Sequence, residues 1–213
     1  MNPGRTGSLG FMSLVTCHMT ISVDGFVAGP VQTREDPIGE GHRLHQWIFR
    51  ADEPGHEADA RLRDQIVSGR GAFIMGRNMY GPIRGEWGDE DWRGWWGEEP
   101  PYHAPVFVLT HYPHDPIEMK GGTTFYFVTE GFDAALSQAR AVAGDAPVDI
   151  AGGAATVQQA FAAGAIDELV LDVVPIVLGA GEALFDGVAD PGLTPVEVIA
   201  SPLATHIRYR VGR

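Results

Sequence analysis

Residues 149–161 read DIAGGAATVQQAF, and this stretch sets the organisation of the chain. An apolar, strand-like run ends at Ala151, two glycines follow, and an alanine-rich pattern of helical spacing starts at Ala154. We therefore expect a buried strand that turns directly into a helix, the repeating unit of a parallel α/β sheet. The glycines have two explanations that the stretch alone does not separate. They permit tight strand-to-helix packing, or they let backbone N–H groups at the helix start face an anion.

Apolar strand patterns and helical patterns alternate along most of the chain. Strand patterns cover residues 12–23, 72–76, 105–110, 123–129, 148–151, 168–178 (interrupted at Pro175) and 206–211. Helical patterns cover residues 44–49, 56–69, 133–144 and 154–164. Helices between apolar strands predict right-handed crossovers, a mostly parallel central sheet and helices on both of its faces. The C-terminal strands follow one another without a helix, so they predict an antiparallel edge.

Composition favours one domain that acts on a small molecule. The chain has 213 residues, 44% of them hydrophobic, and a net charge of -13. That charge repels phosphate backbones and anionic lipid, which argues against nucleic-acid and membrane partners. Cys17 is the single cysteine, so no intrachain disulfide or cysteine zinc site forms, and a cytoplasmic location is expected. Residues 1–11 lack the apolar core of a signal peptide, and we expect a disordered leader before a single domain over residues 12–213.

Two further strand ends carry residues suited to an anionic ligand. In open α/β sheets, ligands lie beyond the carboxyl ends of the strands. After the strand at 72–76, Gly76 allows close backbone approach, Arg77 can fork onto a phosphate, and Asn78 can cap the following helix. After the strand at 105–110, Thr110 offers a hydroxyl and His111 an imidazole ring.

Each strand end also has an ordinary explanation: a turn with a solvated arginine, a common strand exit, or a packing device. The glycine pair is not the G-x-G-x-x-G fingerprint, so a standard Rossmann dinucleotide site is not supported. The placement of all three at successive strand ends favours a ligand with a pyrophosphate at one end and a ribose phosphate at another. We therefore prefer the anion-binding explanation of the glycines.

Five motifs in order resemble the dihydrofolate reductase superfamily. They are S-x-D-G-x-x-A-G (22–29), M-G-R-N-M-Y (75–80), V-L-T-H (108–111), I-A-G-G-A (150–154) and P-I-V-L-G-A-G-E-A-L-F (175–185). Within that superfamily the chain is most similar to the reductase domain of riboflavin-biosynthesis deaminase-reductases, and to stand-alone proteins of that type. The resemblance runs from Met12 to the C-terminus. It implies a three-layer α/β fold and an NADPH-dependent reductase that acts on a small heterocycle, like 5-amino-6-(5-phosphoribosylamino)uracil reductase.

The resemblance also implies roles for individual residues. Those beside the adenosine ribose and its 2′-phosphate would be Gly76, Arg77, Asn78, Thr110 and His111. Those that receive the pyrophosphate would be Gly152, Gly153, Ala154 and Thr156. Ser22 and Asp24 would lie near the nicotinamide and substrate, with Asp24 as the candidate catalytic group. The Asp-Gly pair is equally ordinary turn chemistry.

Departures from the family leave the substrate open. The zinc deaminase signature H-x-E…P-C-x-x-C is absent. Trp47 and Asp52 loosely echo the L-P-W segment and acid of folate reductases, which makes them candidate pocket residues, although the proline is missing. Folate or pterin reduction and a non-catalytic nucleotide-binding homologue therefore stay as alternatives.

Two loops carry no motif and are expected to set substrate specificity, at residues 30–55 and 81–105. The second holds four tryptophans and is expected to form a pocket wall, a lid or a dimer contact. The histidines match no metal-ligand spacing, so no metal site is expected. A homodimer, with its interface at the margin of the 168–178 strand, is compatible with these properties.

Overall fold

The computed structural model describes residues 13–82, 85–88 and 91–212. The expected leader at residues 1–11 lies outside the described residues.

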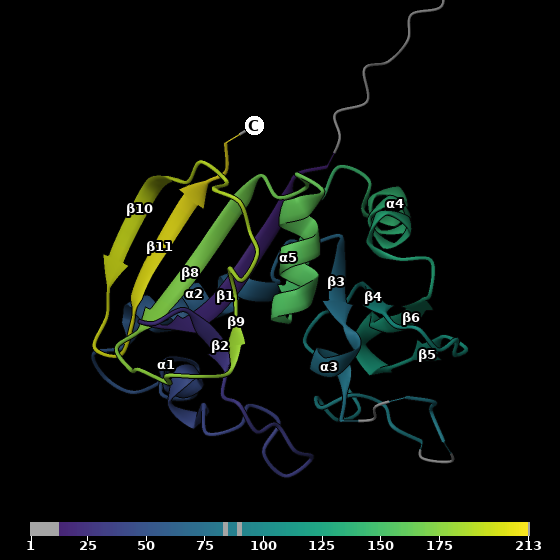
Figure 1. Ribbon diagram of the computed structural model, residues 1–213, viewed down its shortest axis with the longest axis horizontal. Helices are drawn as coiled ribbons and strands as arrows, with labels where there is room; N and C mark the ends of the chain where they lie inside the picture. The colour runs from purple at the N-terminus through teal and green to yellow at the C-terminus, as the bar shows by residue number, and fades with distance from the viewer. Residues whose placement is uncertain (1–12, 83–84, 89–90, 213) are drawn as a thin grey trace, which may run out of the picture.

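One sheet organises the described part of the chain, in the strand order β10-β11-β8-β1-β7-β3-β4-β6-β5 (Figure 1). In that order the strands are Thr194–Ala200, Thr205–Arg210, Glu168–Val174, Val15–Ser22, Val148–Gly152, Ala72–Gly76, Pro105–Leu109, Thr124–Val128 and Ile117–Glu118. The strands from β8 to β6 run parallel, and β11, β10 and β5 are antiparallel to their neighbours. This confirms the mostly parallel sheet with an antiparallel C-terminal edge. β8 ends directly before Pro175, because proline cannot donate to the ladder.

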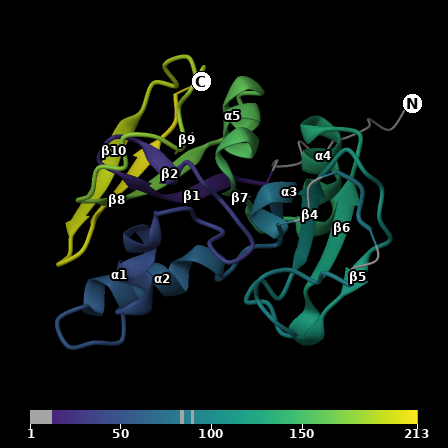
Figure 2. The ribbon, with the colours of Figure 1, turned by 60° about the horizontal axis from the view of Figure 1, so that its bottom comes forward.

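Helices cover both faces of the sheet, as expected (Figures 1 and 2). On one face lie α4 (Phe132–Ala143) and α5 (Ala154–Ala162), and on the other lie η1 (His42–His45), α1 (Gln46–Phe49) and α2 (Glu57–Val67). The shorter elements are β2 (Phe26–Ala28), α3 (Arg77–Tyr80), η2 (Lys120–Gly122) and β9 (Glu182–Ala183). The helical patterns at 44–49, 56–69, 133–144 and 154–164 are all confirmed, with small shifts at their ends.

The central strand β1 presents two chemically different faces. One face is apolar and packs in the core beneath α4 and α5, through Val15, Cys17, Met19 and Ile21. The other face carries Thr16, His18, Thr20 and Ser22. Buried polar groups are stable only with hydrogen-bond partners, so the second face needs a set of polar neighbours.

Those neighbours form a buried histidine–aspartate network of His18, His56, Asp59, Asp172 and His206. His18 Nε2 lies 2.8 Å from Asp172 Oδ2. The two ring nitrogens of His206 lie 2.7 Å from Asp172 Oδ1 and 3.0 Å from Asp59 Oδ1. His56 Nδ1 lies 2.7 Å from Asp59 Oδ2. The network therefore ties α2 to β1, β8 and β11 beneath the second face of the sheet.

The two aspartates that contact His206 favour its imidazolium form. An ionised carboxylate only accepts hydrogen bonds, so both His206 ring nitrogens must donate when both aspartates are ionised. Burial opposes the charged ring, but the hydrogen bonds and charges of Asp172 and Asp59 outweigh it and raise the pKa of His206. Burial likewise opposes the Asp172 carboxylate, and the nearby His18 and His206 nevertheless lower the pKa of that carboxyl.

These two pKa shifts predict a pH window for stability. The raised pKa of His206 means that its stabilisation is full below the ordinary histidine value of about 6.5 and is lost as pH rises through the raised value. The lowered pKa of Asp172 means that its stabilisation is full above about 3.9 and is lost as pH falls through the lowered value. We expect His206→Gln to reduce the free energy of unfolding by about 1.5–3 kcal/mol inside that window, because Asp172 and Asp59 lose a shared charged hydrogen-bond partner, although His18 and His56 remain on them.

Urea unfolding of wild type and His206→Gln between about pH 4 and pH 9 measures this difference. The difference in the free energy of unfolding between wild type and His206→Gln should shrink as pH rises through the raised pKa of His206. His42→Gln is the matched control, because its side chain is 69% exposed and pairs only at the surface with Asp36. A wild-type-minus-variant difference that stays constant across this range would contradict the assignment of an imidazolium.

Candidate functional site

The predicted strand ends lie together at one edge of the sheet. β7, β3 and β4 are adjacent and parallel, so Gly152, Gly76 and Leu109 end their strands at the same edge. β1 ends at Ser22 and joins the same edge through its parallel pairing with β7. Sheet topology therefore brings the motif residues into one row, as the alternating pattern predicted.

The glycine pair makes the turn from β7 into α5. Gly152 has φ +120°, in the region that favours glycine, and the Gly152–Gly153 peptide bond is cis. Gly153 is the N-cap residue of α5, and no side chain in the described part of the chain caps that helix. A Cβ added at Gly153 would meet nothing within 4 Å. No side chain of the described residues therefore competes for the first N–H groups of α5, and the N–H groups that precede the Thr156 N–H, which donates to the Gly153 carbonyl oxygen, suit an anion.

Gly76 is required for packing between β3 and α5. A Cβ at this position would lie 2.6 Å from Thr156 Oγ1 and 3.8 Å from the backbone nitrogen of Gly153. Thr156 itself is buried in the first turn of α5. The close backbone approach expected at Gly76 is therefore an approach of β3 to the Gly152–Gly153 turn. It brings the ends of β3 and β7 together.

Arg77 connects the β3 end to the β4 end. Its Nη1 donates to Thr110 Oγ1 at 3.0 Å, and its Nη2 donates to the carbonyl oxygen of Gly85 at 3.0 Å. The guanidinium carbon lies 3.3 Å from the centroid of the Trp87 ring. Thr110 is buried, and His111 follows it as an exposed residue. The Thr110 hydroxyl also accepts the Tyr112 N–H at 3.1 Å and donates to the Tyr112 carbonyl oxygen at 3.3 Å. The structure therefore brings Arg77 and Thr110 into direct contact.

The helix-capping role expected for Asn78 is wrong. α3 begins at Arg77, directly after β3, so Gly76 occupies the N-cap position and Asn78 lies one residue past the first helical position. Asn78 is exposed and lines a pocket instead.

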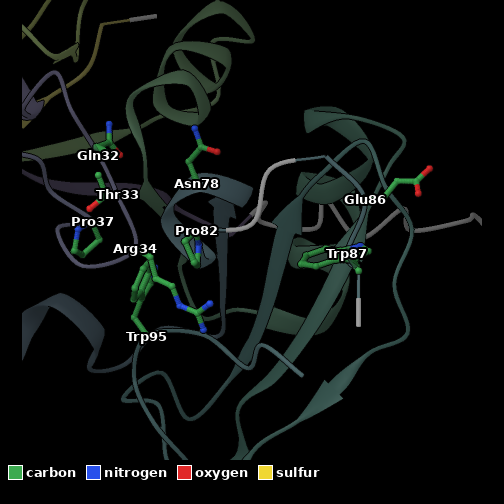
Figure 3. Close-up of a pocket in the computed structure, with 10 residues that line it drawn as sticks. Gln32, Thr33, Arg34, Pro37, Asn78, Pro82, Glu86, Trp87 and Trp95 are labelled. Carbon is green, nitrogen blue, oxygen red and sulfur yellow. The ribbon is translucent and has the colours of Figure 1, made fainter. Parts of the chain in front are cut away.

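That pocket has a volume of about 430 Å³ and lies between the two motif-free loops (Figure 3). It is lined by Gln32, Thr33, Arg34 and Pro37 of the 30–55 loop, by Asn78 of α3, and by Pro82, Glu86, Trp87, Gly88 and Trp95 of the 81–105 segment. Both loops expected to set specificity therefore contribute to one pocket beside α3.

The tryptophan segment at 81–105 covers part of the sheet. Trp87, Trp92 and Trp96 pack against a buried cluster on β3, β4 and β6 that includes Phe73, Val106 and Phe125. α1 and α2 pack instead over the β8 and β11 end of the same face, around Leu44, Trp47 and Leu62. The tryptophan segment thus shields β3, β4 and β6 from solvent, as α1 and α2 shield the β8 and β11 end of this face. Because Trp87 and Trp95 also line the pocket, the pocket-wall interpretation is supported.

The S-x-D-G motif forms a tight turn between β1 and β2. The Phe26 N–H donates to Ser22 Oγ at 3.0 Å. The Asp24 carboxylate accepts the N–H groups of Leu178 at 3.1 Å and Gly179 at 2.7 Å. The Ser22 hydroxyl, and then the N–H groups of Gly179 and Leu178, lower the pKa of Asp24. Asp24 is therefore a carboxylate that anchors the first motif to the last one.

The two residues that echo folate reductases lie elsewhere. Trp47 is fully buried, donates its indole N–H to Thr20 Oγ1 at 3.1 Å, and packs edge-on against His206. The Asp52 side chain is 82% exposed and pairs with Arg63. Neither residue lines the pocket of Figure 3.

Neither a membrane-spanning helix nor a metal-binding group of side chains occurs among the described residues. No helix in the described part of the chain is both long and apolar enough to cross a membrane. Among the same residues, no group of three or more histidines, cysteines or carboxylates is placed to hold a metal ion.

Sequence reasoning missed the histidine–aspartate network and the contact between Arg77 and Trp87. The network joins residues separated by up to 154 positions, so no local spacing reports it. The Arg77–Trp87 pair joins a motif residue to a loop without a motif, and a tryptophan ten positions after an arginine has no periodic meaning.

Comparison with known proteins gives a family and a fold. The sequence model of the RibD C-terminal domain matches residues 13–204. No curated protein matches the chain. Among solved structures, a putative riboflavin biosynthesis protein from Shewanella sp. PV-4 superposes with a TM-score of 0.64 and 19% identity, over 94% of this chain and 99% of that chain.

Two further structures are similar at low identity. Dihydrofolate reductase from Enterococcus faecalis has a TM-score of 0.56 and 12% identity, over 95% of this chain and 99% of that chain. The deaminase/5-amino-6-(5-phosphoribosylamino)uracil reductase of Thermotoga maritima has a TM-score of 0.58 and 14% identity, over 94% of this chain and 57% of that one. The family match covers most of the chain, and the superpositions agree with it in fold. The chain belongs to the RibD C-terminal domain family and has a dihydrofolate reductase-like α/β fold.

Proposed function

We propose that this protein is an NADPH-dependent reductase of a small heterocyclic substrate, similar to 5-amino-6-(5-phosphoribosylamino)uracil reductase. The observation that carries the proposal is the uncapped start of α5 beside the Arg77–Thr110 contact, at one sheet edge. The family is one of NADPH-dependent reductases. The similar reductase from Enterococcus faecalis was solved in complex with NADP(H).

The residues present at this edge fit the two phosphate groups of such a cofactor. The N–H groups at the start of α5, after Gly152 and Gly153, suit the pyrophosphate, because no side chain of the described residues fills that space. Arg77, Thr110 and His111 are the residues proposed for the 2′-phosphate, because the Arg77 guanidinium lies at the end of β4, where Thr110 Oγ1 accepts one of its N–H groups. These donors are local, so they act despite the net charge of -13.

The bound cofactor would supply a hydride, and the protein would supply position and shelter. The pocket beside α3 is the proposed substrate cavity, with Trp87 and Trp95 as apolar walls that exclude water. Asp24 acts in this proposal as an orienting carboxylate that holds the β1–β2 turn, because its lowered pKa keeps it ionised and unable to donate a proton at neutral pH. The folate alternative gains no support from Asp52, which lies at the surface on Arg63.

Stopped-flow oxidation of NADPH with candidate substrates tests the reaction. We expect turnover with ribosylamino-pyrimidines and little with dihydrofolate. Dihydrofolate turnover that methotrexate inhibits would favour the folate alternative. Cofactor binding without oxidation by any pyrimidine or pterin would favour the non-catalytic homologue.

Charge at the glycine turn should control cofactor affinity. Gly153 has φ −74° and open space around it, so Gly153→Asp and Gly153→Ala both fit sterically. An aspartate at the N-cap stabilises a helix but repels a pyrophosphate. We expect Gly153→Asp to weaken NADPH and NADH equally, by about 10- to 100-fold, with no loss of thermal stability. Isothermal titration calorimetry measures this effect, and Gly153→Ala should bind within about threefold of wild type. Unchanged affinity in Gly153→Asp would exclude the pyrophosphate from this turn.

Arg77 should distinguish the two cofactors. A charge-assisted contact to the 2′-phosphate contributes about 1.5–3 kcal/mol, so Arg77→Ala should weaken NADPH about 10- to 100-fold and leave NADH nearly unchanged. Fluorescence titration of both cofactors measures this. Arg63→Ala on α2, which removes a surface arginine, is the control. Equal affinity of the wild type for NADPH and NADH would refute the 2′-phosphate role.

A further inference from the structure

The guanidinium of Arg77 is held by several contacts with described residues. It donates to Thr110 Oγ1 at the end of β4 and to the carbonyl oxygen of Gly85. Its guanidinium carbon lies over the Trp87 ring, 3.3 Å from the ring centroid, and 5.8 Å from the centroid of the Tyr112 ring. The hydrogen bonds and the short contact with the Trp87 ring together restrict the position of the guanidinium.

Trp87 is itself held in one orientation. Its indole N–H donates to the carbonyl oxygen of Tyr112 at 3.0 Å. Its ring meets the rings of Phe127 at 4.9 Å, His114 at 4.9 Å and Tyr80 at 6.0 Å between centroids. Tyr80 is fully buried, so the indole ring rests on the core of the β3–β4–β6 face. The tryptophan therefore forms an ordered surface against which the Arg77 guanidinium packs.

We propose that Trp87 is a specificity-determining residue, which positions Arg77 to select a cofactor that carries a 2′-phosphate. The inference rests on the proposed function, since it concerns the same cofactor. Arginine has many rotamers, and a guanidinium that is already ordered loses less entropy when it binds a phosphate. A ring against the guanidinium also restricts the orientation of its N–H donors, and so the direction from which they meet an anion.

The proposal predicts an effect on one cofactor and not on the other. Trp87 orders the group that meets the 2′-phosphate, whereas NADH has a hydroxyl there. Loss of the Trp87 ring should therefore weaken the binding of NADPH and leave the affinity for NADH unchanged. A merely structural role for Trp87 would weaken both cofactors equally, because it would disturb the whole edge of the sheet.

The test is the ratio of the Kd for NADH to the Kd for NADPH, measured by isothermal titration calorimetry on the full chain. Trp87→Leu keeps apolar bulk against Tyr80 and Phe127 but removes the aromatic face. We expect it to lower the ratio about tenfold, the scale of a cation–π contact. Trp87→Phe restores an aromatic face and should recover most of the ratio.

Trp96→Leu is the matched control, because Trp96 packs against the same apolar cluster as Trp87, does not line the pocket, and has its ring centroid 5.1 Å from that of Tyr102. It should leave the ratio unchanged. In an Arg77→Ala background, Trp87→Leu should cause no further loss of the ratio, because the two residues act through one contact. Should Trp87→Leu fail to fold, Trp87→Met fills similar space without an aromatic face and decides the same question.

The outcomes separate this inference from the proposed function. A wild type that prefers NADPH, with an unchanged ratio in Trp87→Leu, overturns the role of Trp87 and leaves the cofactor proposal standing. An equal loss of both cofactors also overturns it, by assigning Trp87 a structural role. A wild type that binds neither cofactor, or both equally, overturns the proposed function together with this inference.

Discussion

The arrangement of the proposed site depends on the turn between the buried strand β7 and helix α5, where two glycines, Gly152 and Gly153, carry no side chain. Gly152 takes a backbone conformation that favours glycine, and Gly153 leaves the first turn of α5 open. Gly76 on the neighbouring strand lets that turn pack closely through Thr156. Because β7, β3 and β4 are parallel, this one turn also places the Arg77–Thr110 contact at the same edge. The proposed pyrophosphate site and the proposed 2′-phosphate site thus follow from one packing arrangement.

The two faces of the sheet stabilise this edge by different means. α4 and α5 cover one face with apolar packing. The other face combines a charged network around Asp172 and His206 with the apolar cover of the tryptophan segment. Trp87 belongs to that cover and also contacts Arg77, so the core of the β3–β4–β6 face and the proposed cofactor site share a residue. Stability and recognition are therefore coupled at this residue.

Much of the fold could be predicted because the hydrophobic periodicity of short sequence segments indicates the strands and helices. The periodicity around residues 149–161 predicts β7 and α5, and parallel topology then places the strand ends together. The histidine–aspartate network could not be predicted, because Asp59 and His206 approach only in the folded chain. Asn78 was expected to cap a helix, but the helix begins at Arg77, two residues too early for that role. Asp24 shows a similar limit: an Asp-Gly turn predicts a loop, whereas its bonds to Leu178 and Gly179 depend on tertiary structure.

A crystal structure of the protein with bound NADPH tests the central claim most directly, because it locates both phosphate groups at once. We predict the pyrophosphate within hydrogen-bond distance, about 2.7–3.2 Å, of the N–H groups at Gly153 and Ala154. We predict the 2′-phosphate on the Arg77 guanidinium while that group remains stacked on Trp87. A cofactor bound away from the start of α5, with Arg77 turned from its ribose, would contradict the account.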